Sequence, residues 1–155
     1  MRVFGGFAGA CPPTLSSIAL KPMNAKPFLD TNVLLYMLSA DAAKADAARA
    51  LLARGGTISV QVLNEAANVL TRKVRMEIDE ARKTLADIRR FCTIEPLTIA
   101  VHDQALAVAG RYGFSIYDSL IVSTAMAAGC STLYSEDLQH GQEIGTGLTI
   151  ANPFL

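Results

Sequence analysis

Four acidic side chains are the clearest candidates for chemistry in this 155-residue sequence: Asp30, Glu65, Asp118 and Asp137. No lysine or arginine lies within three residues of Asp30, Asp118 or Asp137. If these carboxylates gather in the fold, they repel one another unless another charge compensates them. Mg²⁺ and Mn²⁺ are hard divalent cations that prefer oxygen ligands, and binding one would relieve the repulsion. The acids therefore indicate a magnesium or manganese site.

Two neutral polar side chains, Asn32 and Ser135, lie beside these acids and can orient a carboxylate or hold a metal-bound water. Zinc fits less well, because His102 and His140 are isolated and the three cysteines lie far apart. The same scattered cysteines exclude a disulfide framework and a CxxC site. Cysteines of this kind are typical of a reducing compartment, so we expect a cytoplasmic protein.

The elements that position the acids follow from regular cap and turn signals along the chain. Short strands alternate with longer helices from residue 26 onward, which is typical of βαβ units. This pattern predicts a single α/β domain, with a mostly parallel, short-stranded sheet between helices in an α/β/α sandwich. The expected strands are 26–29, 57–60, 92–97, 131–134 and 148–150, and the expected helices begin at 31 or span 41–54, 60–73, 78–91, 99–112 and 115–128.

This order brings the four acids to one edge of the sheet. Asp30 directly follows the first expected strand, and Asp137 follows strand 131–134. Ligands of open α/β sheets bind beyond the carboxyl ends of the strands, so polar residues there are the best candidates for a site. Glu65 and Asp118 lie near the starts of helices that begin at the same edge. We therefore expect the four side chains to converge.

Asp118 has two possible explanations. At 100° per residue it shares a helix face with the apolar residues Ile121, Val122 and Ala125. An ionised carboxylate on an apolar face is costly unless it is paired, hydrogen-bonded or bound to a metal. The alternative is an ordinary capping-type acid, which is common in the first turn of a helix.

Glu65 lies in a polar row of its helix, with Arg72 two turns further along. Taken alone, Glu65 could be a solvated surface residue. The formal net charge is zero, so a nucleic acid would have to be held by a local patch. Seven of the 14 basic residues fall between Arg72 and Arg90, but four acids interleave with them, as on ordinary solvated faces. Arg72 is the exception that we expect to contact phosphate.

Composition limits the class of protein. The chain is 51% hydrophobic and 18% charged, with a mean hydropathy of +0.30, which suits one domain with one core. No apolar run approaches the ~20 residues that span a bilayer, so we expect no membrane association. Residues 1–25 are rich in glycine and proline, without periodicity. We interpret them as an irregular extension, or as the product of a mis-assigned start with Met23 as the true one, before a domain at 26–155.

Four segments of the sequence together resemble the PIN-domain family, and most of all the VapC-type toxins of bacterial toxin–antitoxin modules. They are FLDTNVL at 28–34, LNE at 63–65, YDSLI at 117–121 and LYSEDL at 133–138. Each segment alone is weakly specific, but their order and spacing together are fairly specific. The resemblance covers about residues 26–155 and leaves the first 25 residues outside.

The resemblance implies a Mg²⁺- or Mn²⁺-dependent endoribonuclease that cleaves RNA phosphodiester bonds as the toxin of a toxin–antitoxin system. It also implies a cognate antitoxin that shields the acidic groove, and in many members a homodimer. Helices 41–54 and 115–128 could supply a dimer surface, although core packing explains the same residues. The implied catalytic and metal-binding residues are Asp30, Glu65, Asp118 and Asp137, with Asn32 and Ser135 in support and Arg72 as a candidate RNA contact.

Three alternatives stay open on the sequence. Glu136 stands beside Asp137, so either of the two acids could face the metal. A catalytically silent module of the same fold could bind RNA or a protein without cutting it, although the retained acids argue against this. A phosphotransfer domain with Asp30 as phosphoacceptor fits poorly, because no second aspartate follows two residues later.

Overall fold

The computed structural model describes residues 26–155, so the interpretation of residues 1–25 and of Met23 concerns a segment outside the described residues. These residues form six helices and one six-stranded sheet. The strands are β1 (Phe28–Leu29), β2 (Gly56–Ser59), β3 (Cys92–Glu95), β4 (Thr132–Tyr134), β5 (Glu143–Ile144) and β6 (Leu148–Ala151). The helices are α1 (Thr31–Tyr36), α2 (Ala42–Ala53), α3 (Val60–Arg72), α4 (Ile78–Arg89), α5 (Ile99–Tyr112) and α6 (Ile116–Ala127).

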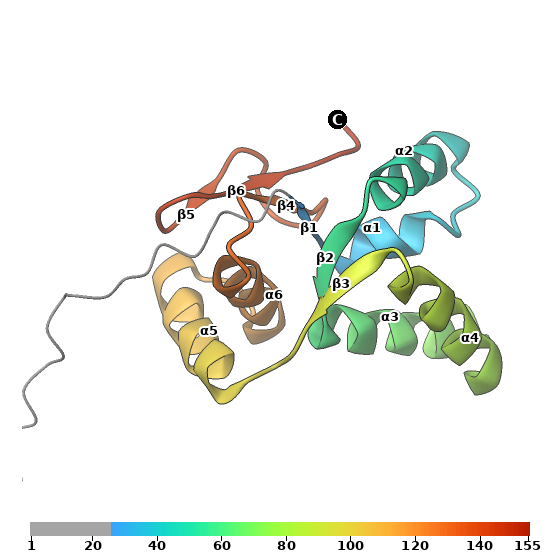
Figure 1. Cartoon of the computed structure of the whole chain (residues 1–155), viewed down its shortest axis with the longest axis horizontal. Coiled ribbons are helices and arrows are strands. Elements are labelled where there is room, and N and C mark those ends of the chain that lie inside the picture. The colour runs from blue at the N-terminus through green and yellow to red at the C-terminus, as the bar shows by residue number, and fades with distance from the viewer. Residues whose placement is uncertain (1–25) are drawn as a thin grey trace, which may run out of the picture.

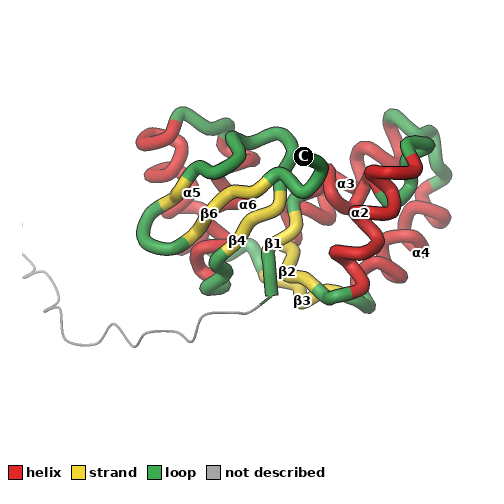
Figure 2. The backbone as a smooth tube through the Cα atoms, turned by 90° about the horizontal axis from the view of Figure 1, so that it is seen from above, coloured by secondary structure: helices red, strands yellow, loops and turns green. Residues whose placement is uncertain are grey.

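The sheet has the strand order β3-β2-β1-β4-β6-β5, which can be followed across Figure 2 from β3 to β6. All its pairs are parallel except that of β5 with β6. The chain moves outward from β1 to β3 and then returns across the sheet to β4. Right-handed crossovers therefore place α5 and α6 on the side opposite α1–α4, as Figure 1 shows. The predicted α/β class with helices on both sides is confirmed.

Side-chain caps fix where several helices begin. The Ser59 hydroxyl accepts from the Val62 amide at 3.3 Å, and the Thr98 hydroxyl accepts from the Val101 amide at 3.2 Å. Both caps agree with the sequence pattern. Gly113 ends α5 with φ of 74°, a left-handed conformation that costs other residues more than glycine. These local signals explain why the predicted helices agree with the structure to within about two residues.

The strands are short, and those at the centre of the sheet contribute fully buried side chains. Phe28, Ile58, Leu133 and Ile150 are each 0% exposed, which is typical of parallel strands covered on both faces. No helix within residues 26–155 combines the length and apolar character needed to cross a membrane.

One strand escapes prediction from the sequence. β5 is only two residues long and pairs antiparallel with β6 through a turn in which Gly145 and Gly147 have positive φ. A two-residue strand is too short to show a hydrophobic period, and its glycines indicate only a turn. The first predicted strand, 26–29, is likewise shortened to Phe28–Leu29.

Two glycines three residues apart in sequence should respond oppositely to alanine. Gly113→Ala places a Cβ in the left-handed conformation, so we expect the free energy of unfolding to fall by roughly 1 kcal/mol. Gly110 lies inside α5, where an added Cβ meets nothing within 4 Å. Gly110→Ala should therefore raise the free energy of unfolding by roughly 0.5–1 kcal/mol. Urea denaturation of both variants measures this, and equal signs would contradict the assignment of the helix end.

Candidate functional site

Asp30 lies at the centre of the candidate site and is 4% exposed. It follows β1 and is the N-cap of α1, where its Oδ1 accepts from the Thr31 amide at 2.6 Å. Its own amide donates to the Tyr134 carbonyl at 3.0 Å and so extends the pairing of β1 with β4. Strand pairing and helix capping together hold this carboxylate beside the end of β4.

The second oxygen of Asp30 accepts two further hydrogen bonds. The buried Ser135 hydroxyl donates to Oδ2 at 2.6 Å, and the Asn32 side-chain amide donates to it at 3.1 Å. The same Asn32 amide donates to Asp137 Oδ2 at 3.1 Å. Asn32 therefore joins two of the predicted acids, and both predicted supporting residues contact Asp30.

Glu65 is held on the other side of Asp30 by neutral donors. Its Oε2 accepts from the Thr31 hydroxyl at 3.0 Å, and its Oε1 accepts from the Gln61 side chain at 2.7 Å. Gln61 is buried and Glu65 is half-buried, so Glu65 is not a freely solvated surface residue. Sequence reasoning missed the roles of Thr31 and Gln61, although Gln61 stands one helical turn before Glu65.

Asp118 lies in the first turn of α6, whose N-cap is Ser115. The Ser115 hydroxyl donates to Asp118 Oδ2 at 2.7 Å and accepts from the Asp118 amide at 3.1 Å. Asp118 is thus a first-turn acid, as the capping alternative expects, but the capping side chain is that of Ser115 and the Asp118 carboxylate only hydrogen-bonds to it. Asp118 also lines one pocket together with Glu65, so the helix starts do bring these two acids toward the same space.

Burial and negative charge govern the ionisation of Asp30. Burial raises the pKa of its carboxyl from 3.8 to about 6, against the lowering effect of the hydrogen bonds from Ser135 and Thr31. The negative charges of Glu65 and Asp137, which lie nearby, raise this pKa further. Within residues 26–155 no lysine or arginine forms an ion pair with any of the four predicted acids.

The four acids approach one another without forming a closed cage. Among the described residues, no three Asp, Glu, His or Cys side chains are close enough to hold one metal ion. Glu65 and Asp118 line one pocket, Asp137 lines a second, and buried Asp30 contacts residues beside each. The oxygen donors and uncompensated charge suit a hard divalent cation.

Glu136 turns away from Asp30. Its carboxylate accepts a hydrogen bond from the Tyr36 hydroxyl and forms an ion pair with the Lys44 ammonium. Pairing lowers the pKa of Glu136 and raises the pKa of Lys44. Of the two neighbouring acids, Asp137 is thus the one linked to Asp30 through Asn32.

The basic residues give a mixed outcome. Arg72 is exposed in the last turn of α3 and does not line the pocket that contains Glu65. Arg82 pairs with Asp79 on the exposed surface of α4, as the solvated interpretation of this segment predicts. Contact of Arg72 with RNA stays a prediction.

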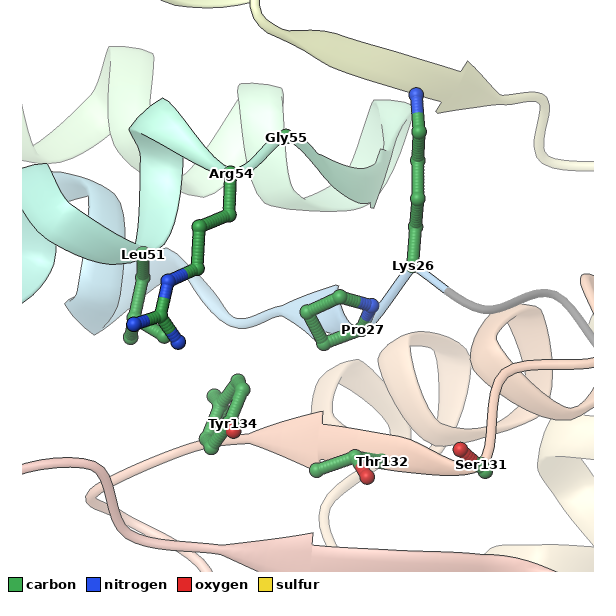
Figure 3. Close-up of a pocket in the computed structure, with 8 residues that line it drawn as sticks. All are labelled: Lys26, Pro27, Leu51, Arg54, Gly55, Ser131, Thr132 and Tyr134. Carbon is green, nitrogen blue, oxygen red and sulfur yellow. The ribbon is translucent and has the colours of Figure 1, made fainter.

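A third pocket lies away from the acids, near the amino ends of β1 and β2 (Figure 3). Lys26 and Pro27 precede β1, and Gly55 precedes β2. No carboxylate is among the residues that line this pocket. Its chemistry therefore differs from that of the acidic edge.

Comparison with known proteins fits this geometry. The sequence profile of the PIN domain matches residues 28–142. The chain belongs to the PIN domain family. Comparison of this PIN domain with curated proteins gave no match.

Solved structures share the fold at low sequence identity. VapC20 of Mycobacterium tuberculosis, a sarcin–ricin loop cleaving toxin, is 21% identical with a TM-score of 0.59, covering 71% of this chain and 88% of its own. A toxin–antitoxin complex from Klebsiella pneumoniae is 19% identical with a TM-score of 0.64. DNA-bound VapBC from Salmonella typhimurium is 19% identical with a TM-score of 0.61. Each of the last two covers 83% of this chain and 98% of its own.

Nucleases of the PIN family generally use divalent metal ions. All four predicted acids, with Asn32 and Ser135, lie inside the matched range. The family assignment does not support the phosphotransfer alternative in which Asp30 is a phosphoacceptor.

The raised pKa of Asp30 predicts a pH-dependent stability in metal-free buffer. In the folded chain Asp30 stays protonated up to about pH 6, whereas in the unfolded chain it loses its proton near pH 4. The contribution of Asp30 to the free energy of unfolding therefore falls as the pH rises from 4 to 6. Asp30→Asn removes this loss. The free energy of unfolding of the variant, relative to wild type, should rise by about 3 kcal/mol from pH 4 to pH 7.

Urea denaturation in EDTA across this range measures the difference. Asp46→Asn is the control, because Asp46 is exposed in a surface ion pair, and its loss should change the free energy of unfolding by less than about 1 kcal/mol. A flat difference for Asp30→Asn would show that the Asp30 carboxyl titrates normally.

Proposed function

We propose that this PIN domain is a metal-dependent endoribonuclease, the toxin of a toxin–antitoxin system. The observation that carries the proposal is the buried Asp30 carboxylate, which faces Glu65 and Asp137 without a cationic partner. Such an arrangement is unfavourable in a purely structural site and favourable in one that binds a divalent cation. The fold shared with toxin structures supports the same activity.

Mg²⁺, or Mn²⁺ in its place, would be held by Asp30, Asp137, Glu65 and Asp118. When bound, the ion would lower the pKa of a water molecule and neutralise charge on the scissile phosphate. The donor set consists of carboxylate oxygens alone, which fits these ions better than zinc.

Neutral side chains of the chain prepare the acids for this role. Ser135 and Asn32 direct Asp30, and Thr31 directs Glu65. Since these partners donate hydrogen bonds without adding positive charge, they orient the carboxylates and leave the negative field available for a cation. Arg72, two turns further along α3 from Glu65, is the candidate contact for RNA phosphate.

RNA cleavage should depend on both metal and Asp118. We expect purified protein, freed of antitoxin, to cleave RNA in Mg²⁺ or Mn²⁺ and not in EDTA. Asp118→Asn should lower kcat/KM roughly a hundredfold or more, because it removes a charged metal-binding oxygen. Gel analysis of structured and unstructured RNAs measures this, with Asp103→Asn on the exposed surface of α5 as the matched control.

Two results would contradict the proposal. Metal-independent cleavage would place the chemistry elsewhere. Absence of cleavage of any RNA, together with absence of Mn²⁺ binding by calorimetry, would favour the catalytically silent binding module instead.

The antitoxin is the partner that we propose for an apolar groove beside the acids. The groove, of about 470 Å³, lies between α1 and α3 and has Asp137 at its margin. Leu38 is 52% exposed and Val74 is 56% exposed, so large apolar side chains remain open to a partner there. An inserted segment with apolar and basic residues would cover both the groove and Asp137. The Klebsiella and Salmonella structures are toxin–antitoxin complexes, which supports this type of partner.

A charge in this groove should weaken the antitoxin complex. Leu38→Asp is expected to raise the Kd at least tenfold, because a carboxylate would have to be desolvated against apolar groups. Leu106→Asp is the matched control, since Leu106 is 54% exposed on α5 outside the groove. Calorimetric titration with the cognate antitoxin compares the two, and an equal effect of both substitutions would refute the assignment of the groove.

The homodimer and the cytoplasmic location stay predictions. The helix predicted at 115–128 is α6, and six of its residues, including Ile121, Val122 and Ala125, are buried. Packing within the domain therefore accounts for its apolar face, and α6 offers little for a second copy of the chain.

A further inference from the structure

Four side chains form a cluster next to the candidate site, beside Asp137: Tyr36, Lys44, Glu136 and Phe154. Lys44 and Tyr36 both contact the Glu136 carboxylate, and the Lys44 ammonium lies 3.2 Å from the Tyr36 hydroxyl. The ammonium also lies 4.5 Å from the centroid of the Tyr36 ring and 5.6 Å from that of Phe154. The two rings pack edge to face with centroids 4.8 Å apart. The ion pair is thus flanked by two aromatic rings.

This ion pair differs from the other two among residues 26–155. The side chains of Lys44 and Glu136 are 31% and 25% exposed, whereas those of the Arg49–Asp46 and Arg82–Asp79 pairs are 59% to 78% exposed. Partial burial and aromatic contact restrict the motion of Lys44, which makes its ion pair a firmer anchor than a solvated one.

The Lys44–Glu136 ion pair is connected to Asp30 and Asp137 through the backbone amide of Glu136. The Glu136 amide donates to Asn32 Oδ1 at 3.3 Å, and the same Asn32 side chain donates to Asp30 and Asp137. The Asp137 amide in turn donates to Ser135 Oγ at 3.2 Å. Residues 135–137 therefore form a turn with Glu136 held outward and Asp137 directed toward Asp30.

We propose that Lys44 is a positioning residue for the metal site: by pairing with Glu136 it fixes the turn at 135–137, so that Asp137 and not Glu136 joins Asp30. The proposal rests on the proposed metal-dependent activity. Lys44 acts through Glu136 and Asn32 and makes no contact with the RNA itself. Its loss should therefore change metal affinity and kcat while leaving the KM for RNA unchanged.

Calorimetry with Mn²⁺ alone tests this on the full chain. Lys44→Met should weaken Mn²⁺ binding roughly tenfold to a hundredfold, as loss of an outer contact of a metal site does, and lower kcat at fixed metal. Lys44→Arg keeps the positive charge and should restore most of the affinity. Arg82→Met removes an exposed ion pair on α4 and is the matched control, expected to bind Mn²⁺ as wild type does.

Two further variants keep the test decisive. The double variant Glu136→Gln/Lys44→Met should lose no more Mn²⁺ affinity than the more harmful of the two single variants, because both substitutions break the same ion pair. Tyr36→Phe retains the ring and loses only the hydroxyl bond to Glu136, so it reports a smaller loss of affinity if Lys44→Met fails to fold.

The outcomes separate this proposal from the proposed function. Wild type that binds Mn²⁺ and cleaves RNA, with unchanged affinity in Lys44→Met, would overturn the positioning role alone. A raised KM for RNA with unchanged Mn²⁺ affinity would make Lys44 a substrate contact and would also overturn it. Wild type that binds no Mn²⁺ would overturn both.

Discussion

The burial of one carboxylate, that of Asp30, is the constraint on which the rest of the site depends. Parallel pairing of β1 with β4 puts Asp30 next to Ser135, and the start of α1 supplies an amide to the same carboxylate. These bonds offset part of the cost of burial, yet its pKa still rises to about 6. The charges of Glu65 and Asp137 make the ionised form of Asp30 still less favourable. A site of this kind gains most from a bound cation, because the ion relieves both burial and repulsion.

The surrounding side chains divide into two groups by charge. Neutral donors hydrogen-bond to Asp30 and Glu65 and orient them; these donors are Ser135, Asn32, Thr31 and Gln61. Lys44 pairs with Glu136 and not with Asp30. This separation preserves the negative field at Asp30 while the neighbouring acid is neutralised.

Much of this arrangement could be predicted from the sequence. The approach of Asp30 and Asp137 could be predicted because each follows a strand, and parallel strands end at one edge of the sheet. Helix starts at Ser59, Thr98 and Ser115 were found because their caps are local chemistry. Signals of this kind need only a few adjacent residues.

Contacts between distant residues could not be predicted in the same way. Lys44 and Glu136 are 92 residues apart in sequence, and Thr31 and Glu65 are 34 apart. Neither pair leaves a local pattern, since tertiary packing alone brings its members together. The choice between Glu136 and Asp137 was open for this reason, because the pairing of Lys44 with Glu136 and the bridge from Asn32 to Asp137 are both contacts between distant residues.

The most direct test of the account is the number of protons released when Mn²⁺ binds. Calorimetric titration near pH 6, in two buffers with different ionisation enthalpies, gives this number. Because Asp30 has a pKa of about 6, the account predicts that about half a proton is released per site at pH 6, and almost none at pH 8. Binding without proton release at pH 6, or no binding at all, would contradict the claim that Asp30 is the central metal-binding carboxylate.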